Sequence, residues 1–170
     1  MENIVFYLLV ILFSFLQVSF FNSFPLYMSK PDLVLVMLVI YGLRKDAFTT
    51  VFAGFFCGLT VSFTSGSSFG FNALTYITAG FLTVLIREKI INEGYILPLA
   101  VVFIVSIIKN IFMLLLLVKF NYIINFGSYY VDALVRSLYN LIFAFPVLAV
   151  YDLIESKIIV KNQKFSDILK

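Results

Sequence analysis

Few side chains in this sequence are of the types that catalyse reactions. Histidine, the residue used most often as a general acid or base, is absent. No cluster of acids or cysteines has the spacing of a metal site, and Gly66 and Gly70 are not followed by the Lys-Ser/Thr pair of a phosphate-binding loop. Several acids stand at the ends of apolar runs, where charges remain solvated: Glu88, Glu93, Asp152 and Glu155. We therefore predict that the protein is not an enzyme and holds no cofactor or metal.

A more informative charge lies inside an apolar run. Lys109, followed by Asn110, stands near the middle of the segment 95–118. A charge at the centre of a membrane costs ~3 kcal/mol or more, so such residues usually face a protein interior or a wet cavity. Two interpretations remain open: Lys109 and Asn110 line a substrate or ion pathway, or Lys109 snorkels or makes an internal polar contact.

A second polar group stands near the start of the last apolar run. Asp132 and Arg136 are four residues apart, so they can pair on one face of a helix. Asn140 continues the same face. We interpret these three residues first as a structural clamp.

The elements that must position these residues are membrane-spanning helices. Hydrophobic residues make up 62% of the chain and charged residues 12%, against about 25% charged residues in a soluble domain. The segment 47–86 contains no charge at all, and a helix needs about 20 apolar residues to cross a bilayer. The sequence therefore predicts an all-α integral membrane protein with one transmembrane domain over residues 1–155 and a basic tail over 156–170.

Six spans account for the apolar runs. The second is too short to cross a bilayer, so it must extend through Arg44 and Lys45, thin the bilayer, or stop part-way across. Pro31 is placed at the first position of this helix, where proline is favourable. The predicted spans cover approximately residues 4–21, 31–43, 47–64, 71–86, 95–118 and 133–151.

The distribution of basic residues predicts the orientation. Cytoplasmic segments of membrane proteins are enriched in Lys and Arg. With six spans and both termini in the cytoplasm, the inner segments hold Arg44, Lys45, Arg87, Lys89, Lys157, Lys161, Lys164 and Lys170, whereas the outer links hold Lys30 and Lys119. Because the positive charge is scattered between spans, we expect no nucleic-acid partner. The tail either lies along the anionic lipid of the inner leaflet or frays.

Small residues form a stripe on the third span. Gly54, Gly58 and Ser62 recur every four residues and therefore share one helix face. Small residues allow helix backbones to approach closely in lipid. The face is predicted either to pack within this chain or to contact a helix of a partner.

Three patches resemble the rod shape-determining protein MreD family. They are the Lys-Pro-Asp-Leu-Val-Leu run at 30–35, the stretch 58–74 with its Ser-Gly-Ser-Ser-Phe-Gly turn at 65–70, and Pro146 with Asp152 before the basic tail. The resemblance covers most of the chain, and the second patch is its most distinctive part. Family members commonly carry an Asp at the position that Ser62 occupies here.

The resemblance implies a non-enzymatic scaffold in the bacterial cytoplasmic membrane. Its partners would be the single-span periplasmic protein MreC, the MreB filament, and the peptidoglycan polymerase RodA with its class B penicillin-binding transpeptidase. The scaffold would hold the helix of MreC and help position the wall synthases to maintain rod shape. Candidate residues for partner contact or packing are Pro31, Asp32, Gly54, Gly58, Ser62, Ser65, Gly66 and Gly70, with the 31–32 and 65–70 elements expected near each other at the outer surface.

MreD proteins are also similar in architecture to the S-components of energy-coupling-factor transporters. The alternative function is therefore a vitamin-binding subunit of such a transporter. S-components typically dock through alanines spaced four apart in the first span, but the first span here has no alanine and the chain has no tryptophan for ligand stacking. A co-purifying vitamin would distinguish this alternative from the scaffold.

Overall fold

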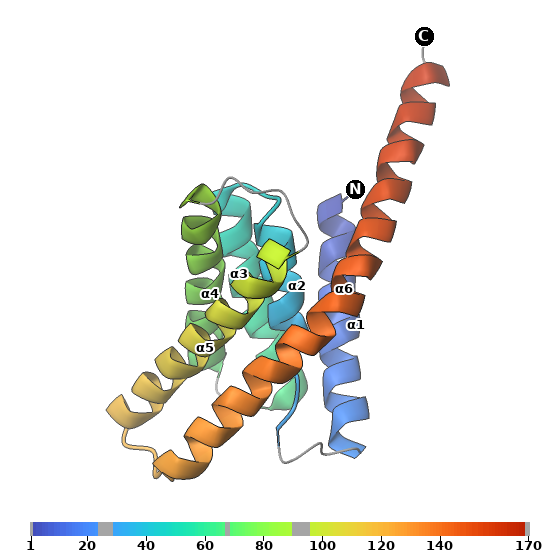
Figure 1. Ribbon diagram of the computed structural model, residues 1–170. Coiled ribbons are helices and arrows are strands. Elements are labelled where there is room, and N and C mark those ends of the chain that lie inside the picture. Colours follow the sequence, from blue (N-terminus) through green and yellow to red (C-terminus); the bar gives the residue numbers. More distant parts are fainter. Residues whose placement is uncertain (1, 24–28, 67–68, 90–95, 169–170) are drawn as a thin grey trace.

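The structure is a computed structural model that describes residues 2–23, 29–66, 69–89 and 96–168. The described residues are entirely helical apart from short links, in agreement with the predicted fold class (Figure 1). The helices are α1 (Glu2–Ser23), α2 (Leu33–Gly42), α3 (Ala47–Ser65), α4 (Phe69–Lys89), α5 (Ile96–Lys119) and α6 (Phe126–Ile168).

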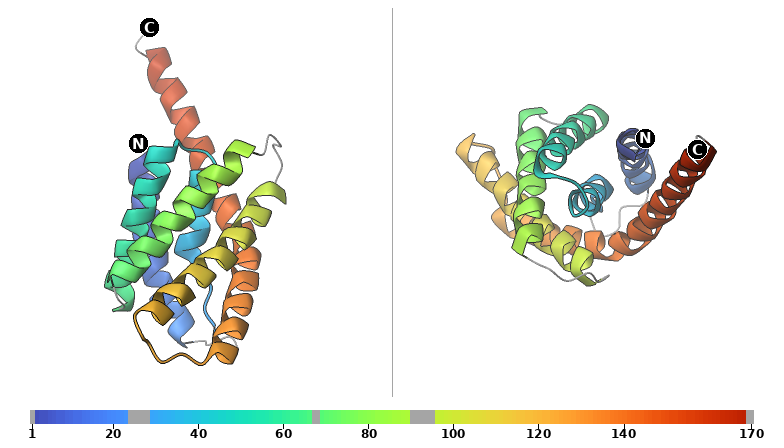
Figure 2. Two further views of the ribbon diagram at one scale, coloured as in Figure 1. Left: turned by 90° about the vertical axis from the view of Figure 1, so that its left-hand side faces the viewer. Right: turned by 90° about the horizontal axis from the view of Figure 1, so that it is seen from above.

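The helices form a bundle around the short helix α2. Figure 2 shows, in the view from above, α2 at the centre with the other helices arranged around it, and α2 contacts each of those five. α1 begins and α6 ends on the same side of the bundle, which we call the terminal end (Figure 1). The opposite side, where α3 and α5 end and α4 and α6 begin, is called the distal end.

Four helices are long and apolar enough to cross a membrane. They are α3, α4, α5 and the part of α6 up to Ile154. Shorter apolar stretches, among the residues whose side chains are described, are Asn3–Ser19 of α1 and Leu33–Gly42, which is α2. These lengths support a helical protein with multiple membrane passes.

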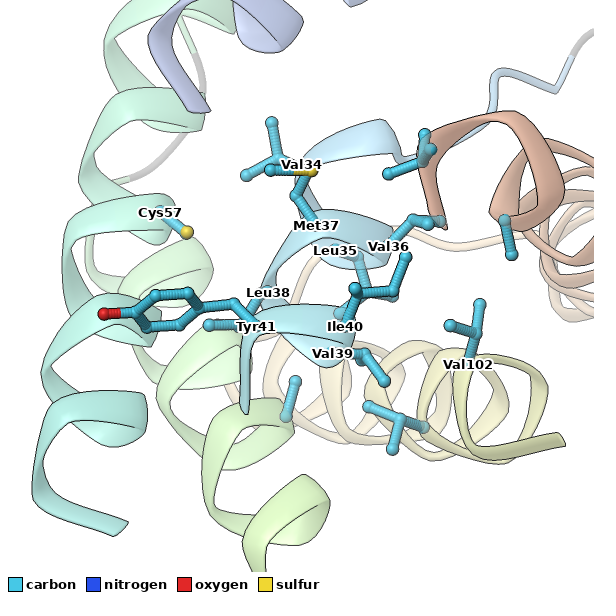
Figure 3. Packing of buried hydrophobic residues seen from close by; sticks show 14 of the residues in the cluster. Val34, Leu35, Val36, Met37, Leu38, Val39, Ile40, Tyr41, Cys57 and Val102 are labelled. Atoms are coloured by element: carbon cyan, nitrogen blue, oxygen red, sulfur yellow. The ribbon is translucent and has the colours of Figure 1, made fainter. Parts of the chain in front are cut away.

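α2 covers only part of the length of the bundle, from Asp32 inside it to the terminal end, which is compatible with a second span that stops part-way across. Its 10 residues rise about 15 Å, half of a ~30 Å hydrocarbon core. Every residue of α2 is buried. Figure 3 shows its side chains pointing in all directions into the core, towards Cys57 of α3 and Val102 of α5. A helix that is apolar on all sides is stable only when it is enclosed, as α2 is.

The start of α2 differs from the prediction. Asp32 is the N-cap, because its side chain accepts a hydrogen bond from the backbone N–H of Leu35 at 3.0 Å. Pro31 therefore precedes the cap instead of occupying the first helical position. Both residues are buried within the bundle, whereas Ser65, Gly66 and Gly70 are exposed. The expected meeting of these elements at the surface is thus wrong.

Basic side chains fix the other end of α2, at the terminal end of the bundle. The Arg87 guanidinium on α4 donates to the carbonyl oxygens of Gly42, at 3.4 Å, and of Lys45. Cations are favourable at a helix C-terminus, where carbonyl groups lack partners. Arg44 pairs with Asp152 of α6 at 2.5 Å, and both side chains are about one-third exposed, at 31% and 34%. Such exposed pairs contribute only ~0–1 kcal/mol.

α3 begins at an aspartate cap outside the apolar core. The Asp46 carboxylate accepts hydrogen bonds from the backbone N–H of Thr49 at 2.9 Å and from its hydroxyl at 2.7 Å. These bonds stabilise the charged carboxylate and lower the pKa of Asp46 below its usual value. α3 ends at Gly66, whose φ of 64° is the left-handed conformation that glycine adopts without steric cost.

α6 is longer than predicted at both ends. It begins at Phe126 instead of near Ala133, because Asn125 accepts a hydrogen bond from the backbone N–H of Ser128 at 3.4 Å and so caps an earlier turn. It continues to Ile168, so residues 156–168 are a helical extension of α6 and not a frayed tail. Hydropathy marks only where a helix is apolar, whereas a helix can continue through polar residues and, as at Pro146 of α6, past a proline.

Candidate functional site: a buried polar network at the start of α2

Asp32 is the centre of a polar network inside the bundle. Its side chain is 7% exposed. One carboxylate oxygen accepts hydrogen bonds from the Tyr76 hydroxyl at 2.5 Å and from Leu35 N–H, and the other pairs with the Lys109 ammonium. The Asp32 backbone N–H donates to Asn140 Oδ1 at 2.6 Å. One residue therefore links α2 to α4, α5 and α6.

Lys109 makes an internal polar contact. Its side chain is 10% exposed, and its ammonium lies 3.8 Å from the centroid of the Tyr76 ring in addition to its pairing with Asp32. A cation over an aromatic face is attracted by the ring quadrupole. The carboxylate and the ring together compensate the charge of Lys109, and this arrangement favours the internal contact over a pathway lining.

A second layer of hydrogen bonds joins α5 to α6. Asn140 donates to the Ser106 hydroxyl at 2.9 Å. Asn110 donates to the carbonyl oxygen of Ala133 at 3.2 Å and lies 3.4 Å from the Ser137 hydroxyl. These residues are buried or nearly so, and buried polar groups need such partners because an unpaired one costs ~1–3 kcal/mol. The side-chain amides of Asn110 and Asn140 therefore join α5 to α6.

The predicted pair of Asp132 and Arg136 is not formed in the described part of the chain. Asp132 instead accepts a hydrogen bond from the Ser29 hydroxyl at 3.2 Å. The Arg136 Nε is buried and has no hydrogen-bond partner. Spacing on a helix brings two residues to one face, but it does not decide which neighbour each side chain meets.

The small-residue stripe of α3 lies inside the protein, against α4. A Cβ atom added at Gly54 would stand 2.6 Å from the carbonyl oxygen of Tyr76, and one added at Gly58 would stand 2.6 Å from Cα of Ala73. Real Cβ atoms do not approach backbone so closely, so the two helix backbones can touch only through glycine. Ser62 is fully buried and accepts a hydrogen bond from the Asn72 side chain at 3.1 Å.

Gly66 and Gly70, at the distal end, do not pack against any other backbone that the structure describes. A Cβ added at Gly66 or Gly70 would meet nothing within 4 Å. Gly66 is required for its positive φ, whereas Gly70 lies in the first turn of α4 and is not among the positive-φ glycines. Among the described residues there is therefore no packing reason for glycine at position 70.

The network can hold the bundle in one arrangement, but it is poorly suited to acid–base chemistry. Asp32 and Lys109 neutralise each other, and both are enclosed. A buried ion pair adds little net stability because desolvation offsets its attraction, yet removal of one partner is costly. Such pairs can specify which helices meet. Within the described residues, no group of three His, Cys, Asp or Glu could hold a metal ion.

Sequence reasoning singled out Asp32 and Lys109 but did not bring them together. A usable signal existed: they are opposite charges within or beside apolar runs, where each needs a partner. Tyr76 and Ser106 were missed because a tyrosine or a serine in an apolar span is compatible with many roles. Arg44 and Arg87 were interpreted as topology signals and Asp152 as a solvated acid, and their contacts were not anticipated.

A comparison of the sequence with models of protein families finds a match. The model of the rod shape-determining protein MreD matches residues 2–154, which include the whole of α1 to α5 and α6 up to Ile154. No curated protein and no solved structure matches the chain. The similarity to S-components therefore stays a prediction. The match covers most of the chain and agrees with the resemblance seen in its three patches, so this membrane protein belongs to the MreD family, whose role is the determination of rod shape.

Proposed function

We propose that the protein is a non-enzymatic scaffold of the bacterial cell-wall elongation machinery. It would lie in the cytoplasmic membrane with both termini in the cytoplasm, bind MreC, and help position RodA and its transpeptidase relative to the MreB filament. Membership of the MreD family is the observation that carries this proposal. In this orientation the terminal end faces the cytoplasm and the distal end faces the periplasm.

The distribution of polar groups supports a binding role. The charges of Asp32 and Lys109 are used in contacts within the chain. The links described between helices are short: residues 43–46 join α2 to α3, and residues 120–125 join α5 to α6. Little of the described chain extends beyond the helices, so a partner would meet helix surfaces or the short turns at either end.

The contact with MreC is not expected to use the Gly54–Gly58 face, because that face is already covered by α4. We place the contact instead at the distal end, around Ser65, Gly66 and Gly70, which belong to the most distinctive patch of the family resemblance. Glycine in the first turn of a helix loses conformational entropy. Because position 70 has no internal reason for glycine, close approach of a partner is a physical reason for it.

This proposal is tested by purifying the tagged protein from its host in mild detergent and identifying the bound proteins. We expect MreC and the wall synthases in the wild-type sample. Gly70→Leu is expected to retain the fold but to lose at least tenfold of the bound MreC. Gly127→Leu is the matched control, because Gly127 occupies the same position in the first turn of α6 and is also exposed.

One result would contradict the scaffold, and another would contradict only the place of the contact. A bound vitamin together with an ATPase-linked membrane subunit would indicate the transporter alternative. Equal recovery of MreC with the Gly70 and Gly127 variants would remove the distal turn of α3 and α4 from the contact, although the scaffold itself would stand.

A further inference from the structure

Arg136 is a charged residue of the bundle that the network around Asp32 leaves without a partner. It lies about 15 Å along α6 from the first residue, at ~1.5 Å per residue, within the apolar stretch Phe126–Ile154. Its Nε is buried and has no hydrogen-bond partner. Part of the residue remains accessible, since its overall exposure is intermediate.

The side chain faces the polar interior and not the lipid. Its charge acts on Lys109 of α5, on Tyr76 of α4 and on Tyr129 about two turns earlier in α6. The lipid-facing residues of the same stretch are Leu134 and Leu138, which are 56% and 51% exposed. Arg136 therefore adds a second positive charge beside Lys109 within the bundle.

The acids near Arg136 are engaged elsewhere. Both carboxylate oxygens of Asp32 accept hydrogen bonds, from Tyr76 and Leu35 on one side and from Lys109 on the other. Asp132 accepts a hydrogen bond from Ser29, and no ion pair joins it to Arg136 in the described part of the chain. The segment 24–28, which leads to Ser29, contains no acid and can supply no carboxylate.

We propose that Arg136 anchors a binding site for a small molecule that carries an oxyanion, either a carboxylate or a phosphate. A guanidinium that is always charged and offers donors in a rigid fork binds such groups in a bidentate manner. The proximity of Lys109 adds further positive potential. An oxyanion beside the guanidinium would place an acceptor near the buried Nε and negative charge near Lys109 and Arg136. This site is independent of the proposed contact with MreC.

The test measures thermal unfolding of the purified, full-length protein in detergent. Inorganic phosphate and acetate are compared with sodium chloride at matched ionic strength, so that general screening is the same in each sample. At concentrations about tenfold above the dissociation constant, phosphate or acetate is expected to raise the melting temperature of the wild type by about 3–6 °C. A response to only one of the two anions identifies which oxyanion the site takes.

Three variants make the result specific to Arg136. Arg136→Gln is expected to abolish the response and, without added oxyanion, to be at least as stable as the wild type, because an uncompensated charge has been removed. Arg44→Gln removes an arginine that is paired with Asp152 and should keep the full response. Asp132→Asn should also keep it.

Other outcomes overturn the proposal. The site does not exist if neither oxyanion stabilises the wild type more than chloride does, or if Arg136→Gln responds as the wild type does. If Arg136→Gln and Asp132→Asn are destabilised to the same degree in chloride alone, Arg136 is compensated by Asp132 and acts as a structural clamp.

Discussion

Substitution of Asp32 by alanine is expected to destabilise the bundle by about 3–5 kcal/mol, the usual cost of leaving one member of a buried ion pair without its partner. The Lys109 ammonium would lose its carboxylate in a membrane interior, and the Tyr76 hydroxyl and the N-terminus of α2 would lose an acceptor. Because Asp32 contacts three other helices, we expect α2 to lose its fixed position. Thermal unfolding of the purified protein, followed by circular dichroism, measures the effect.

A double variant separates the charge of Lys109 from the other losses. Asp32→Ala combined with Lys109→Met removes both charges, and replacement of a whole buried pair by apolar residues is often close to neutral. The double variant is therefore expected to be more stable than Asp32→Ala alone. Asp32→Asn is the second control, since its amide oxygen can still accept from Leu35. If the double variant is no more stable than the single one, the ion pair does not explain the cost.

Substitution of Gly58 by leucine is expected to separate α3 from α4. Even a Cβ at this position would stand 2.6–2.8 Å from backbone atoms of Asn72 and Ala73, and backbone cannot move aside as a side chain can. Overpacking of a well-packed interior typically lowers the free energy of unfolding by ~1–3 kcal/mol. Because leucine adds much more than a Cβ, we expect Gly58→Leu to lose ~3 kcal/mol or more. Thermal unfolding of the purified protein measures this loss of stability. Gly58→Ala should lose less stability than Gly58→Leu.

Gly70→Ala is the matched control for Gly58→Ala, because a Cβ at Gly70 would meet nothing within 4 Å. We expect it to leave stability unchanged or to raise it by ~0.5–1 kcal/mol, since alanine is the better helix former. A Gly58→Leu protein with wild-type stability that fails to bind MreC would contradict this account. That result would mean that the face meets a partner and not α4.

The sequence predicted the helical class and most helix positions because apolar length is a local property. The ranges of α3, α4 and α5 agree closely with the predicted spans, since uncharged runs bounded by turns or charges leave little choice. α6 extends beyond the predicted sixth span at both ends, because the Asn125 cap and the polar extension to Ile168 lie outside the apolar run. Hydropathy cannot detect a helix boundary that hydrogen bonding sets.

The candidate site was predicted only as separate residues. Asp32 was named through the family resemblance, in the patch at 30–35, and Lys109 for its depth, but the distance in sequence between them hides their pairing. The stripe of Gly54 and Gly58 had two open interpretations, because periodicity shows which residues share a face and not what covers it. Contacts between distant elements depend on how helices pack, and a single sequence does not specify this packing.

The central claim, that the protein acts by binding, is tested most directly with purified components. The wild-type protein and full-length MreC, each in detergent, are mixed and separated by gel filtration, and the fractions are analysed for both chains. The account predicts a stable complex in which the two chains elute together, and much less of it with Gly70→Leu than with Gly127→Leu. Separate elution of two folded proteins, at concentrations where each remains soluble, would contradict the claim that this chain holds MreC as a scaffold.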